Sequence, residues 1–336
     1  MKIIVPMAGM GKRMRPHTLT IPKPLIPIAG KPIVQRLVEE IAIVSEEEIE
    51  EIAFIIGDFG KEVEEELQNI ASNLGAKASI YYQHEALGTA HAIYCAEPSL
   101  DGKVVVAFAD TLFKADFKIT EETEASIWVQ KVDDPSAFGV VKVNDSNIIT
   151  DFIEKPKDFV SDLAIIGIYY FKDGNNLKQE LKYLIDNKIL VNGEYQLTDV
   201  LENMKNKGVK FIPGEIKEWM DCGNKNATVH TNQRILEYHK NDKLVCETAT
   251  IDNSIIIEPC YIGDGAIVKN SIVGPHVSIG ANTTVDKVII SNSIVQRNAS
   301  IRSITLTNSM IGNSATVADV TVEISVGDFT EIDIEK

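Results

Sequence analysis

Cysteine, long apolar segments and positive charge are all scarce in this chain, and each scarcity excludes a class of protein. The four cysteines are scattered without a C-x-x-C pair, which argues against a zinc site and a disulfide framework. No segment has the length and apolarity needed to span a bilayer, and the apolar stretch at the N-terminus is too short for a signal-peptide core. We therefore expect a protein of the reducing cytoplasm with no membrane partner.

The charge of the chain argues against nucleic acid as a partner. The formal net charge is -16, which repels DNA and RNA unless the basic residues are gathered in one place. Seven of the 33 basic residues do lie in residues 1–38, where there is no acidic residue. This local excess of positive charge indicates a small anion as the natural ligand.

The first 240 residues have the pattern of an α/β domain. Short apolar runs, each typical of a buried strand, alternate with amphipathic stretches of helical spacing. This alternation predicts a doubly wound, mixed but mostly parallel sheet of Rossmann type, with antiparallel strands inserted beside its parallel strands between about residues 125 and 171. A linking helix is predicted over residues 226–240. The predicted catalytic domain therefore spans 1–240.

After about residue 244 the sequence becomes a repeat. Aliphatic residues recur every five or six positions from Ile251 to Val317, and similar coils begin at Ile262, Ile279, Val295 and Ile311. This hexapeptide pattern is typical of a left-handed parallel β-helix, in which each short strand points one aliphatic side chain inward. We expect such a helix over residues 245–330. Its flat sides or open end commonly pack on another subunit, so we also expect a homo-oligomer.

The candidate phosphate site lies directly after the first strand. Gly9 and Gly11 allow backbone N–H groups to approach phosphate oxygens, and Arg13 and Lys23 supply positive charge nearby. A lone G-x-G would be an ordinary tight turn, but here it stands in an acid-free basic run that also contains P-K-P and K-P. The spacing matches neither the dinucleotide-binding G-x-G-x-x-G nor the P-loop, so both are disfavoured.

This segment resembles the sugar-1-phosphate nucleotidylyltransferase family, which includes glucose-1-phosphate thymidylyltransferases and UTP-dependent uridylyltransferases. The family pattern of A-G-x-G-x-R, P-K-x-L-x-P-I and K-P is reproduced from Ala8 to Pro32. The resemblance implies an enzyme that joins a nucleoside triphosphate to a sugar 1-phosphate and releases pyrophosphate. It implies that Ala8, Gly9 and Gly11 bind the nucleotide and that Arg13 and Lys23 are catalytic.

A second block, YYQHEALGTAHAI, provides candidate residues for the base. Gln83 follows a predicted strand and can read a base edge with its amide, and Gly88 begins a helix. The family resemblance places the base here and adds Thr89. Taken alone, the block could also be a plain strand, loop and helix with a solvated glutamine.

Two aspartates are candidates for a metal site. Asp110 ends a predicted strand at the carboxyl edge of the sheet, where ligands of open α/β folds bind, and Asp221 lies in the block EWMDCGN. Mg²⁺ prefers oxygen ligands and keeps several waters, so two carboxylates and phosphate oxygens suffice to hold it. The resemblance identifies Asp110 and Asp221 with the two metal-binding aspartates of the family.

Three further blocks predict the sugar-phosphate site. Glu154 can accept hydrogen bonds from sugar hydroxyls, Lys155 can hold the phosphate, and Gly139 allows the backbone to approach the ring. The family resemblance adds Tyr169 and implies dTTP or UTP with glucose 1-phosphate as the substrates.

Two alternatives remain at this stage. Hexapeptide β-helices also build acetyl-CoA-dependent acyltransferases, for which His276 would be the candidate base, so the protein could carry a second activity. It could also be a non-catalytic regulatory subunit, although the intact basic and acidic residues argue against that.

Overall fold

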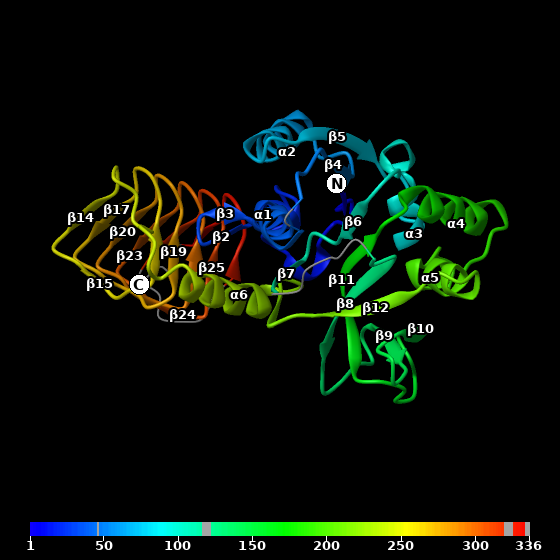
Figure 1. Ribbon diagram of the computed structural model, residues 1–336. Helices are drawn as coiled ribbons and strands as arrows, with labels where there is room; N and C mark the ends of the chain where they lie inside the picture. Colours follow the sequence, from blue (N-terminus) through cyan, green and yellow to red (C-terminus); the bar gives the residue numbers. More distant parts are fainter. Residues whose placement is uncertain (46, 116–121, 319–324, 333–336) are drawn as a thin grey trace. The chain divides into compact units, whose positions relative to one another are not determined.

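The computed structural model describes residues 1–45, 47–115, 122–318 and 325–332 (Figure 1). The contacts between residues group the chain into two compact units. The first unit comprises Met1–Gly9 and Leu37–Trp219, and the second comprises Met10–Arg36 and Met220–Lys336. The basic segment after the first strand is therefore grouped with the C-terminal half of the chain. The predicted domain limits at residues 240 and 245 stay a prediction, and residues 319–324 of the predicted β-helix lie outside the described residues.

A mixed sheet forms the centre of the first unit. Its order is β10-β9-β11-β6-β1-β4-β5, with β8 beside β11 and β12 beside β8. Strands β1, β4, β5 and β6 run parallel, as do β8 and β12, whereas β11 is antiparallel to its neighbours. The strands of this sheet are β1 (Lys2–Pro6), β4 (Glu51–Ile56), β5 (Lys77–Tyr82), β6 (Val104–Ala107), β8 (Ala125–Lys131), β9 (Gly139–Val143), β10 (Ile149–Glu154), β11 (Leu163–Phe171) and β12 (Phe211–Glu215). This confirms the predicted mostly parallel α/β sheet.

The antiparallel strands differ from the prediction in their position. We expected them as an insertion beside the parallel strands, but β11 pairs directly with β6 and continues the sheet itself. The sequence of β11, LAIIGIYYF, is apolar on both faces, and seven of its nine residues are buried. A strand that is apolar on both faces is expected within a sheet whose two faces are both covered by other elements.

Helices flank this sheet. They are α1 (Ile33–Ser45), which begins in the second unit, α2 (Lys61–Asn73), α3 (Thr89–Tyr94), α4 (Gly174–Asp186) and α5 (Leu197–Asn206). The apolar spacing of residues 88–100 predicts a single helix, but α3 ends at Tyr94 and gives way to a short 3₁₀ helix, Glu97–Ser99. Pro98 contributes to this ending, because it has no backbone N–H to donate to the Tyr94 carbonyl. None of the described helices is long and apolar enough to cross a membrane.

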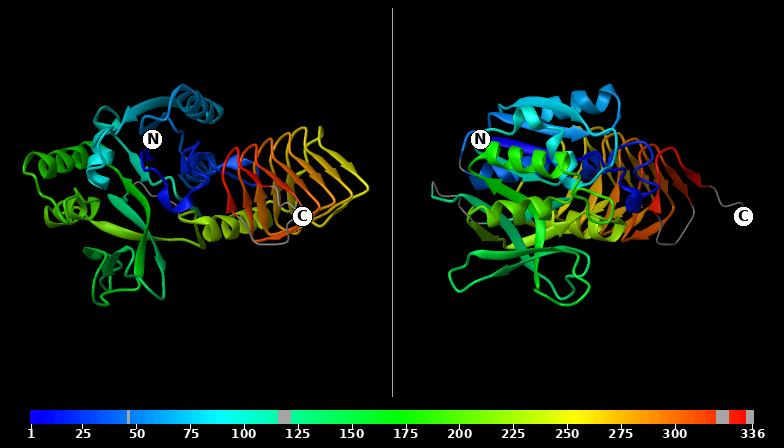
Figure 2. Two further views of the ribbon diagram at one scale, coloured as in Figure 1. Left: turned by 180° about the vertical axis from the view of Figure 1, so that it is seen from behind. Right: turned by 90° about the vertical axis from the view of Figure 1, so that its right-hand side faces the viewer.

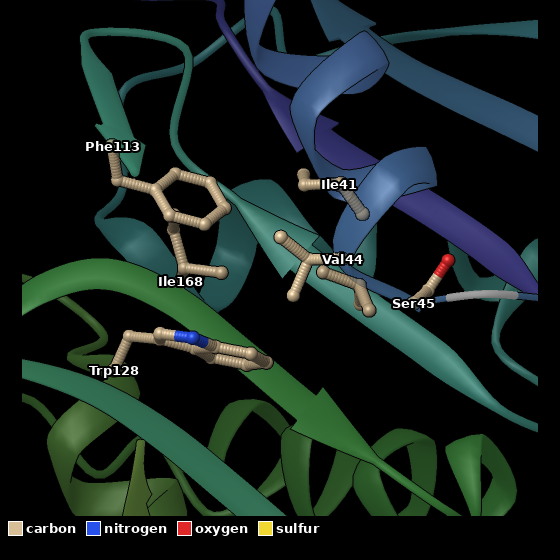
Figure 3. A pocket seen from close by; sticks show the side chains of 7 residues that line it. Ile41, Val44, Ser45, Phe113, Trp128 and Ile168 are labelled. Atoms are coloured by element: carbon tan, nitrogen blue, oxygen red, sulfur yellow. The ribbon is translucent and has the colours of Figure 1, made fainter. Parts of the chain in front are cut away.

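Helix α1 packs on the sheet with a small gap in the apolar core (Figure 3). The gap has a volume of about 10 Å³, room for one water at most. It is lined by Ile41, Val44, Ser45, Val105, Phe113, Trp128 and Ile168. Because its lining is almost wholly apolar, the gap is a packing feature of the core and not a ligand site.

A parallel β-helix forms most of the second unit, with its short strands stacked coil on coil (Figure 2). One wall runs β14 (Thr250–Asp252), β17 (Ile267–Lys269), β20 (Thr284–Asp286), β23 (Ser300–Arg302), β26 (Thr316–Ala318) and β28 (Glu331–Ile332). The second runs β15 (Ile255–Ile256), β18 (Ile272–Val273), β21 (Ile289–Ser291) and β24 (Thr305–Thr307). The third runs β16 (Cys260–Ile262), β19 (Val277–Ile279), β22 (Ser293–Val295), β25 (Met310–Ile311) and β27 (Ser325–Val326).

The stacking confirms the predicted repeat. Ile262, Ile279, Val295 and Ile311 lie in register on successive coils, and all are buried. The prediction is wrong for Ile251 and Ile257, which are 41% and 43% exposed. Ile251 belongs to the first coil, which has no coil before it to cover its side chain. Ile257 is out of register, because its neighbour Ile256 pairs with the buried Val273 and packs on the core.

The segment of residues 10–36 and helix α6 complete the second unit. The segment contains two 3₁₀ turns, Lys12–Met14 and Lys23–Leu25, and a small hairpin of β2 (Pro27–Ile28) and β3 (Lys31–Pro32). Helix α6 (Lys225–Tyr238) is the predicted linking helix, and it contacts β2 as well as β19 and β22 of the β-helix (Figure 1). Two short strands, β7 (Thr111–Lys114) and β13 (Glu218–Asp221), were not predicted separately.

Candidate active site

The basic segment is folded tightly around Gly11. This residue has a φ of 56°, in the left-handed region that favours glycine, and a Cβ built on it would lie 2.9 Å from the Cβ of Lys23. The Thr18 hydroxyl donates a hydrogen bond to the Gly11 carbonyl at 2.9 Å. A glycine at position 11 therefore lets the chain fold back so that Lys23 lies against the glycine loop, as the phosphate-site prediction requires.

Arg13 and Asp221 meet at Gly223. A Cβ on Gly223 would lie 3.0 Å from both carboxylate oxygens of Asp221 and 3.4 Å from a guanidinium nitrogen of Arg13. The Gly223 N–H donates to the Asp221 carboxylate at 2.9 Å, which fixes this carboxylate at the end of β13. The second unit thus brings together a predicted catalytic arginine and a predicted metal ligand that are far apart in the sequence.

The amide of Gln83 has a defined orientation. Its Nε2 donates to the Gly88 carbonyl at 3.3 Å and lies 3.2 Å from Nδ1 of His91. A carbonyl oxygen can only accept, so Nε2 must be on this side and Oε1 on the other. Burial lowers the pKa of His91, while the nearby Glu85 opposes this effect, so its ring is held in the neutral form that can accept. Oε1 of Gln83, a hydrogen-bond acceptor, therefore lies on the side of the amide away from Gly88 and His91.

The backbone conformation and the neighbouring atoms at position 88 require a glycine there. It has a φ of 112°, and a Cβ there would lie 2.4 Å from the Tyr195 carbonyl oxygen. The backbone N–H of Tyr195 donates to the Leu87 carbonyl at 2.8 Å, which holds the two segments together. The Thr89 hydroxyl accepts a hydrogen bond from the Leu197 N–H at 3.0 Å. The block that contains Gln83 is thus closed on one side by residues 193–199.

The predicted sugar residues gather around Glu154. A Cβ on Gly139 would lie 3.1 Å from a Glu154 carboxylate oxygen, so glycine at 139 leaves that oxygen accessible to a ring. The Thr198 hydroxyl donates a weak hydrogen bond to the same oxygen at 3.4 Å. Burial first, and then the charge of Glu154, raises the pKa of Tyr169, which is therefore a neutral phenol.

Lys155 adopts an unusual backbone conformation. Its φ is 41°, in the left-handed region, and its N–H donates to the Phe138 carbonyl at 3.1 Å. Its ammonium lies 3.7 Å from Glu154, and its side chain is exposed. Left-handed conformations of non-glycine residues carry strain and persist where the surroundings enforce them, often at binding sites.

The structure adds less about the predicted pairing of Asp110 with Asp221 and about Ala8 and Gly9. Asp110 follows β6 in the first unit and Asp221 ends β13 in the second, so their pairing stays a prediction. Ala8 and Gly9 follow β1, and open space surrounds the Cβ position of Gly9. No cluster of three or more His, Cys, Asp or Glu residues suited to a metal occurs in the described parts of the chain.

The sequence analysis missed three residues of the first unit. His91, which orients Gln83, lies in the quoted block three residues after Gly88, so the helix spacing could have identified it. Tyr195 and Thr198 lie in the block GEYQLTDVL (residues 193–201), which the family resemblance places only at the border of the sugar site. Their contacts with Gly88 and Glu154 join residues far apart in the sequence, and no local pattern reveals such a contact.

A basic loop around Gly11, an oriented amide at Gln83 and a carboxylate at Glu154, in a chain with a Rossmann-like sheet, are typical of a nucleotide-dependent transferase. The comparison with protein families agrees. The chain belongs to the nucleotidyl transferase family, whose model matches residues 2–238, and residues 231–302 match the GlmU-like C-terminal hexapeptide model. The protein is therefore a nucleotidyltransferase followed by a hexapeptide β-helix, in agreement with the predicted left-handed form.

Several characterised relatives resemble most of the chain. The low-salt glycan biosynthesis nucleotidyltransferase Agl11 of Haloferax volcanii is 31% identical over 88% of this chain and 87% of its own length. A glucose-1-phosphate thymidylyltransferase of Streptomyces griseus is 29% identical over 89% and 88%. The bifunctional protein GlmU of Methanococcus maripaludis is 31% identical, but the match covers 80% of this chain and only 62% of GlmU.

A solved structure supports the fold of the larger part of the chain. The crystal structure of a UDP-glucose pyrophosphorylase complexed with UDP-glucose has a TM-score of 0.58 and 25% identity. The match covers 70% of this chain and 98% of that protein.

Proposed function

We propose that this protein transfers a nucleotidyl group from a nucleoside triphosphate to a sugar 1-phosphate, giving a nucleotide-sugar and pyrophosphate. The observation that carries this proposal is the contact of Arg13 and Asp221 on Gly223, beside a loop that holds Lys23 against Gly11. Positive charge and a fixed carboxylate in one place are suited to a metal-bound polyphosphate. The relatives named above include a thymidylyltransferase and a pyrophosphorylase, which supports the same reaction.

The reaction needs no nucleophilic side chain. A phosphate oxygen of the sugar 1-phosphate attacks the α-phosphorus, and the bond to the bridging oxygen breaks so that its electron pair leaves with pyrophosphate. Catalysis then consists of positioning the two substrates and neutralising the charge that develops on the phosphate oxygens. Arg13 and Lys23 supply that charge, while Glu154 accepts hydrogen bonds from sugar hydroxyls.

Mg²⁺ fits the donors that the chain offers. Asp110 and Asp221 are carboxylates at strand ends, and the Gly223 N–H holds the Asp221 carboxylate in place. Such hard oxygen donors, with waters and phosphate oxygens, suit magnesium. When bound, the ion would neutralise phosphate charge, and Asp110 and Asp221 are the residues that would hold it.

The orientation of Gln83 supports UTP or dTTP as the nucleotide. Its Oε1 can accept from the N3–H of uracil or thymine, whereas cytosine presents an acceptor at N3. The same amide cannot reverse without placing Oε1 against the Gly88 carbonyl. We therefore expect CTP to be a poor substrate, and we expect glucose 1-phosphate to be a good sugar substrate, as the relatives' names suggest.

A pyrophosphate-release assay tests the function. UTP, dTTP, CTP and ATP are each combined with the 1-phosphates of glucose, N-acetylglucosamine and mannose, in the presence of Mg²⁺. Turnover with UTP or dTTP supports the proposal, while nucleotide binding without turnover would identify a regulatory subunit. Lys23→Ala should reduce kcat by about 10³-fold, as expected when a charge that stabilises the transition state is removed. Lys61→Ala, on the exposed start of α2, is the matched control.

The structure does not favour a second, acetyl-transferring activity. Nε2 of His276 lies 2.7 Å from the Glu237 carboxylate of α6, and the side chain of His276 is 16% exposed. An imidazole covered by a helix is poorly placed to act on acetyl-CoA. Consumption of acetyl-CoA in the presence of an amino-sugar phosphate would show that this argument is wrong.

One wall of the β-helix supports a homo-oligomer. Ile255, Ile272 and Ile289 lie in register on successive coils, and their exposed fractions are 59%, 36% and 54%. A row of exposed isoleucines on a flat parallel sheet is typical of a subunit interface. Ile272→Asp should lower the mass measured by light scattering if this wall joins subunits.

The free thiols of all four cysteines also agree with a cytoplasmic location.

A further inference from the structure

Helix α6 buries polar side chains where an apolar face would be expected. Thr228, Thr231 and Asn232 all have an exposed fraction of 0%. Their spacing of three and four residues places them on one face of the helix. A buried polar group destabilises the fold unless it is hydrogen-bonded, so each of these side chains must have a specific role.

Asn232 connects three parts of the second unit. Its Oδ1 accepts from the Ala29 N–H at 2.9 Å and from the Ser278 hydroxyl at 2.7 Å, and its Nδ2 donates to the His276 carbonyl at 3.4 Å. The Ala29 N–H can only donate and the His276 carbonyl can only accept, so the orientation of the amide is determined. Asn232 therefore ties the segment of residues 10–36 to the β-helix through α6.

The bond from Ala29 is made at a strained point of that segment. Ala29 and Gly30 form the two-residue turn between β2 and β3, with φ values of 46° and 85°. Two successive positive φ angles are typical of a tight hairpin turn, and alanine adopts this conformation only at a cost. Arg36 holds the other side of the turn, because its guanidinium donates to the carbonyls of Ile28 and Ala29, both at 2.6 Å.

Side chains of the β-helix hold the segment from two further directions. The ring of Tyr261 lies over Gly30, where a Cβ would come within 2.3 Å of two ring carbons. Nearer the start of the segment, His17 is buried and its Nε2 lies 2.6 Å from the hydroxyl of Ser325. Pro16 packs on Gly327, where a Cβ would lie 2.7 Å from the Pro16 Cβ. The segment is thus anchored at residues 16–17 and again at 29–30.

Lys23 lies between these two anchors, and Arg13 lies just before the first. We propose that Asn232 is a positioning residue, which fixes residues 10–36 to the β-helix and so sets the placement of the two catalytic cations. The β-helix then acts as a scaffold for phosphate binding as well as a site of assembly. This inference rests on the proposed function for its catalytic consequence, whereas the anchoring itself is a property of the fold.

Preorganisation is the physical reason to expect an effect on turnover. A cation that must be ordered during the reaction stabilises the transition state less than one that is already held in place. Loss of the Asn232 bonds frees the turn at Ala29, and that freedom extends to Lys23 six residues earlier. Glu154 and Gly139 belong to the other unit, so binding of the sugar should change little.

Asn232→Leu, which preserves size and removes all three bonds, is the test. Ser293→Ala is the matched control, because Ser293 is equally buried and bonds to Ser291 and Ser309 within the β-helix without touching the segment. Amide hydrogen exchange at residues 26–32 and steady-state kinetics of pyrophosphate release are measured on both full-length variants.

The expected result separates positioning from general destabilisation. In Asn232→Leu we expect exchange of the Ala29 amide to become about tenfold faster or more, which is a loss of about 1.4 kcal/mol of local stability. We expect kcat to fall about tenfold or more while KM for the sugar 1-phosphate stays within about twofold. In Ser293→Ala both the exchange at Ala29 and kcat should match the wild type.

Three results would overturn the inference. The first is unchanged exchange at Ala29 in Asn232→Leu, and the second is faster exchange with unchanged kcat. An equal fall of kcat in Ser293→Ala would also overturn it, since the effect would then be general destabilisation. If the wild-type protein releases no pyrophosphate with any substrate pair, the proposed function fails, and the exchange at Ala29 still decides whether Asn232 anchors the segment.

Discussion

The free energy of unfolding of this protein should decrease as the pH falls, because one histidine is buried. His17 lies in the basic segment with an exposed fraction of 0%, and its Nε2 faces the Ser325 hydroxyl at 2.6 Å. Its Nδ1 has no hydrogen-bond partner within the described residues. Burial, and to a lesser degree the charge of Lys225, lowers the pKa of His17 from 6.5 to about 4.

The sign of the effect follows from the two protonation states. In the unfolded chain His17 takes up a proton as the pH falls below about 6.5, whereas in the folded protein it stays neutral down to about 4. The unfolded state therefore binds more protons within this window, and the free energy of unfolding decreases as the pH falls through it. The full difference corresponds to about 3 kcal/mol, and about 2 kcal/mol of it should be lost by pH 5.

The assay compares wild type with His17→Gln by urea denaturation at pH 7.5 and pH 5.0. Glutamine can still reach the Ser325 hydroxyl and does not titrate, so the stability of the variant lacks this pH dependence. The difference in unfolding free energy between wild type and variant should therefore change by about 2 kcal/mol between the two pH values. His230→Gln, an exposed position on α6, is the control and should show no such change.

A constant difference at both pH values would refute the reasoning. It would mean that His17 is protonated in the folded state at pH 5, and hence that the pocket between the basic segment and the last described coils admits charge. The anchor at Ser325 would then be weaker than its geometry indicates.

Three further predictions concern stability. Neither amide atom of Gln296 has a partner in the described part of the chain although the side chain is fully buried, so Gln296→Leu should raise the free energy of unfolding by about 1 kcal/mol in urea denaturation. Gly88→Ala should lower it by about 3 kcal/mol, because the new Cβ would lie 2.4 Å from the Tyr195 oxygen at a left-handed φ; a loss below about 0.5 kcal/mol would show that the contact relaxes easily. Burial alone would raise the pKa of Glu51, but hydrogen bonds from two serine hydroxyls, together with two lysines, lower it. Its stabilisation is therefore present above the ordinary carboxyl pKa and lost as the pH falls through the lowered value, so Glu51→Gln should remove about 2 kcal/mol at pH 7, and this loss should shrink as the pH falls below 4.5.

The fold could be predicted from the sequence wherever a local pattern repeats. The period of the β-helix predicted correctly that Ile262, Ile279, Val295 and Ile311 are buried, because each coil places its aliphatic residue in the same environment. The pattern failed for Ile251, where the repeat has no previous coil. It also could not place β11, since pairing with β6 depends on which strands compete for the same edge and not on the sequence of β11 alone.

The candidate site could be predicted only in part, for a related reason. Gly11 and Lys23 are close in sequence, and the motif that contains them indicates their contact. Gly88 and Tyr195 meet across more than a hundred residues, and Ala29 is separated from Asn232 by 203. Such contacts are set by tertiary packing, to which a single sequence gives no direct access.

The polar face of α6 is better explained by specificity than by stability. Leucines at positions 228, 231 and 232 could fill the same volume, and a well-packed apolar contact is often at least as stable as a buried polar one. An apolar contact, however, tolerates small shifts of one surface over another, whereas the amide of Asn232 satisfies its three partners in one arrangement only. A segment that carries Arg13 and Lys23 must be held in one position to act on a phosphate. The polar junction is therefore expected where the β-helix meets that segment.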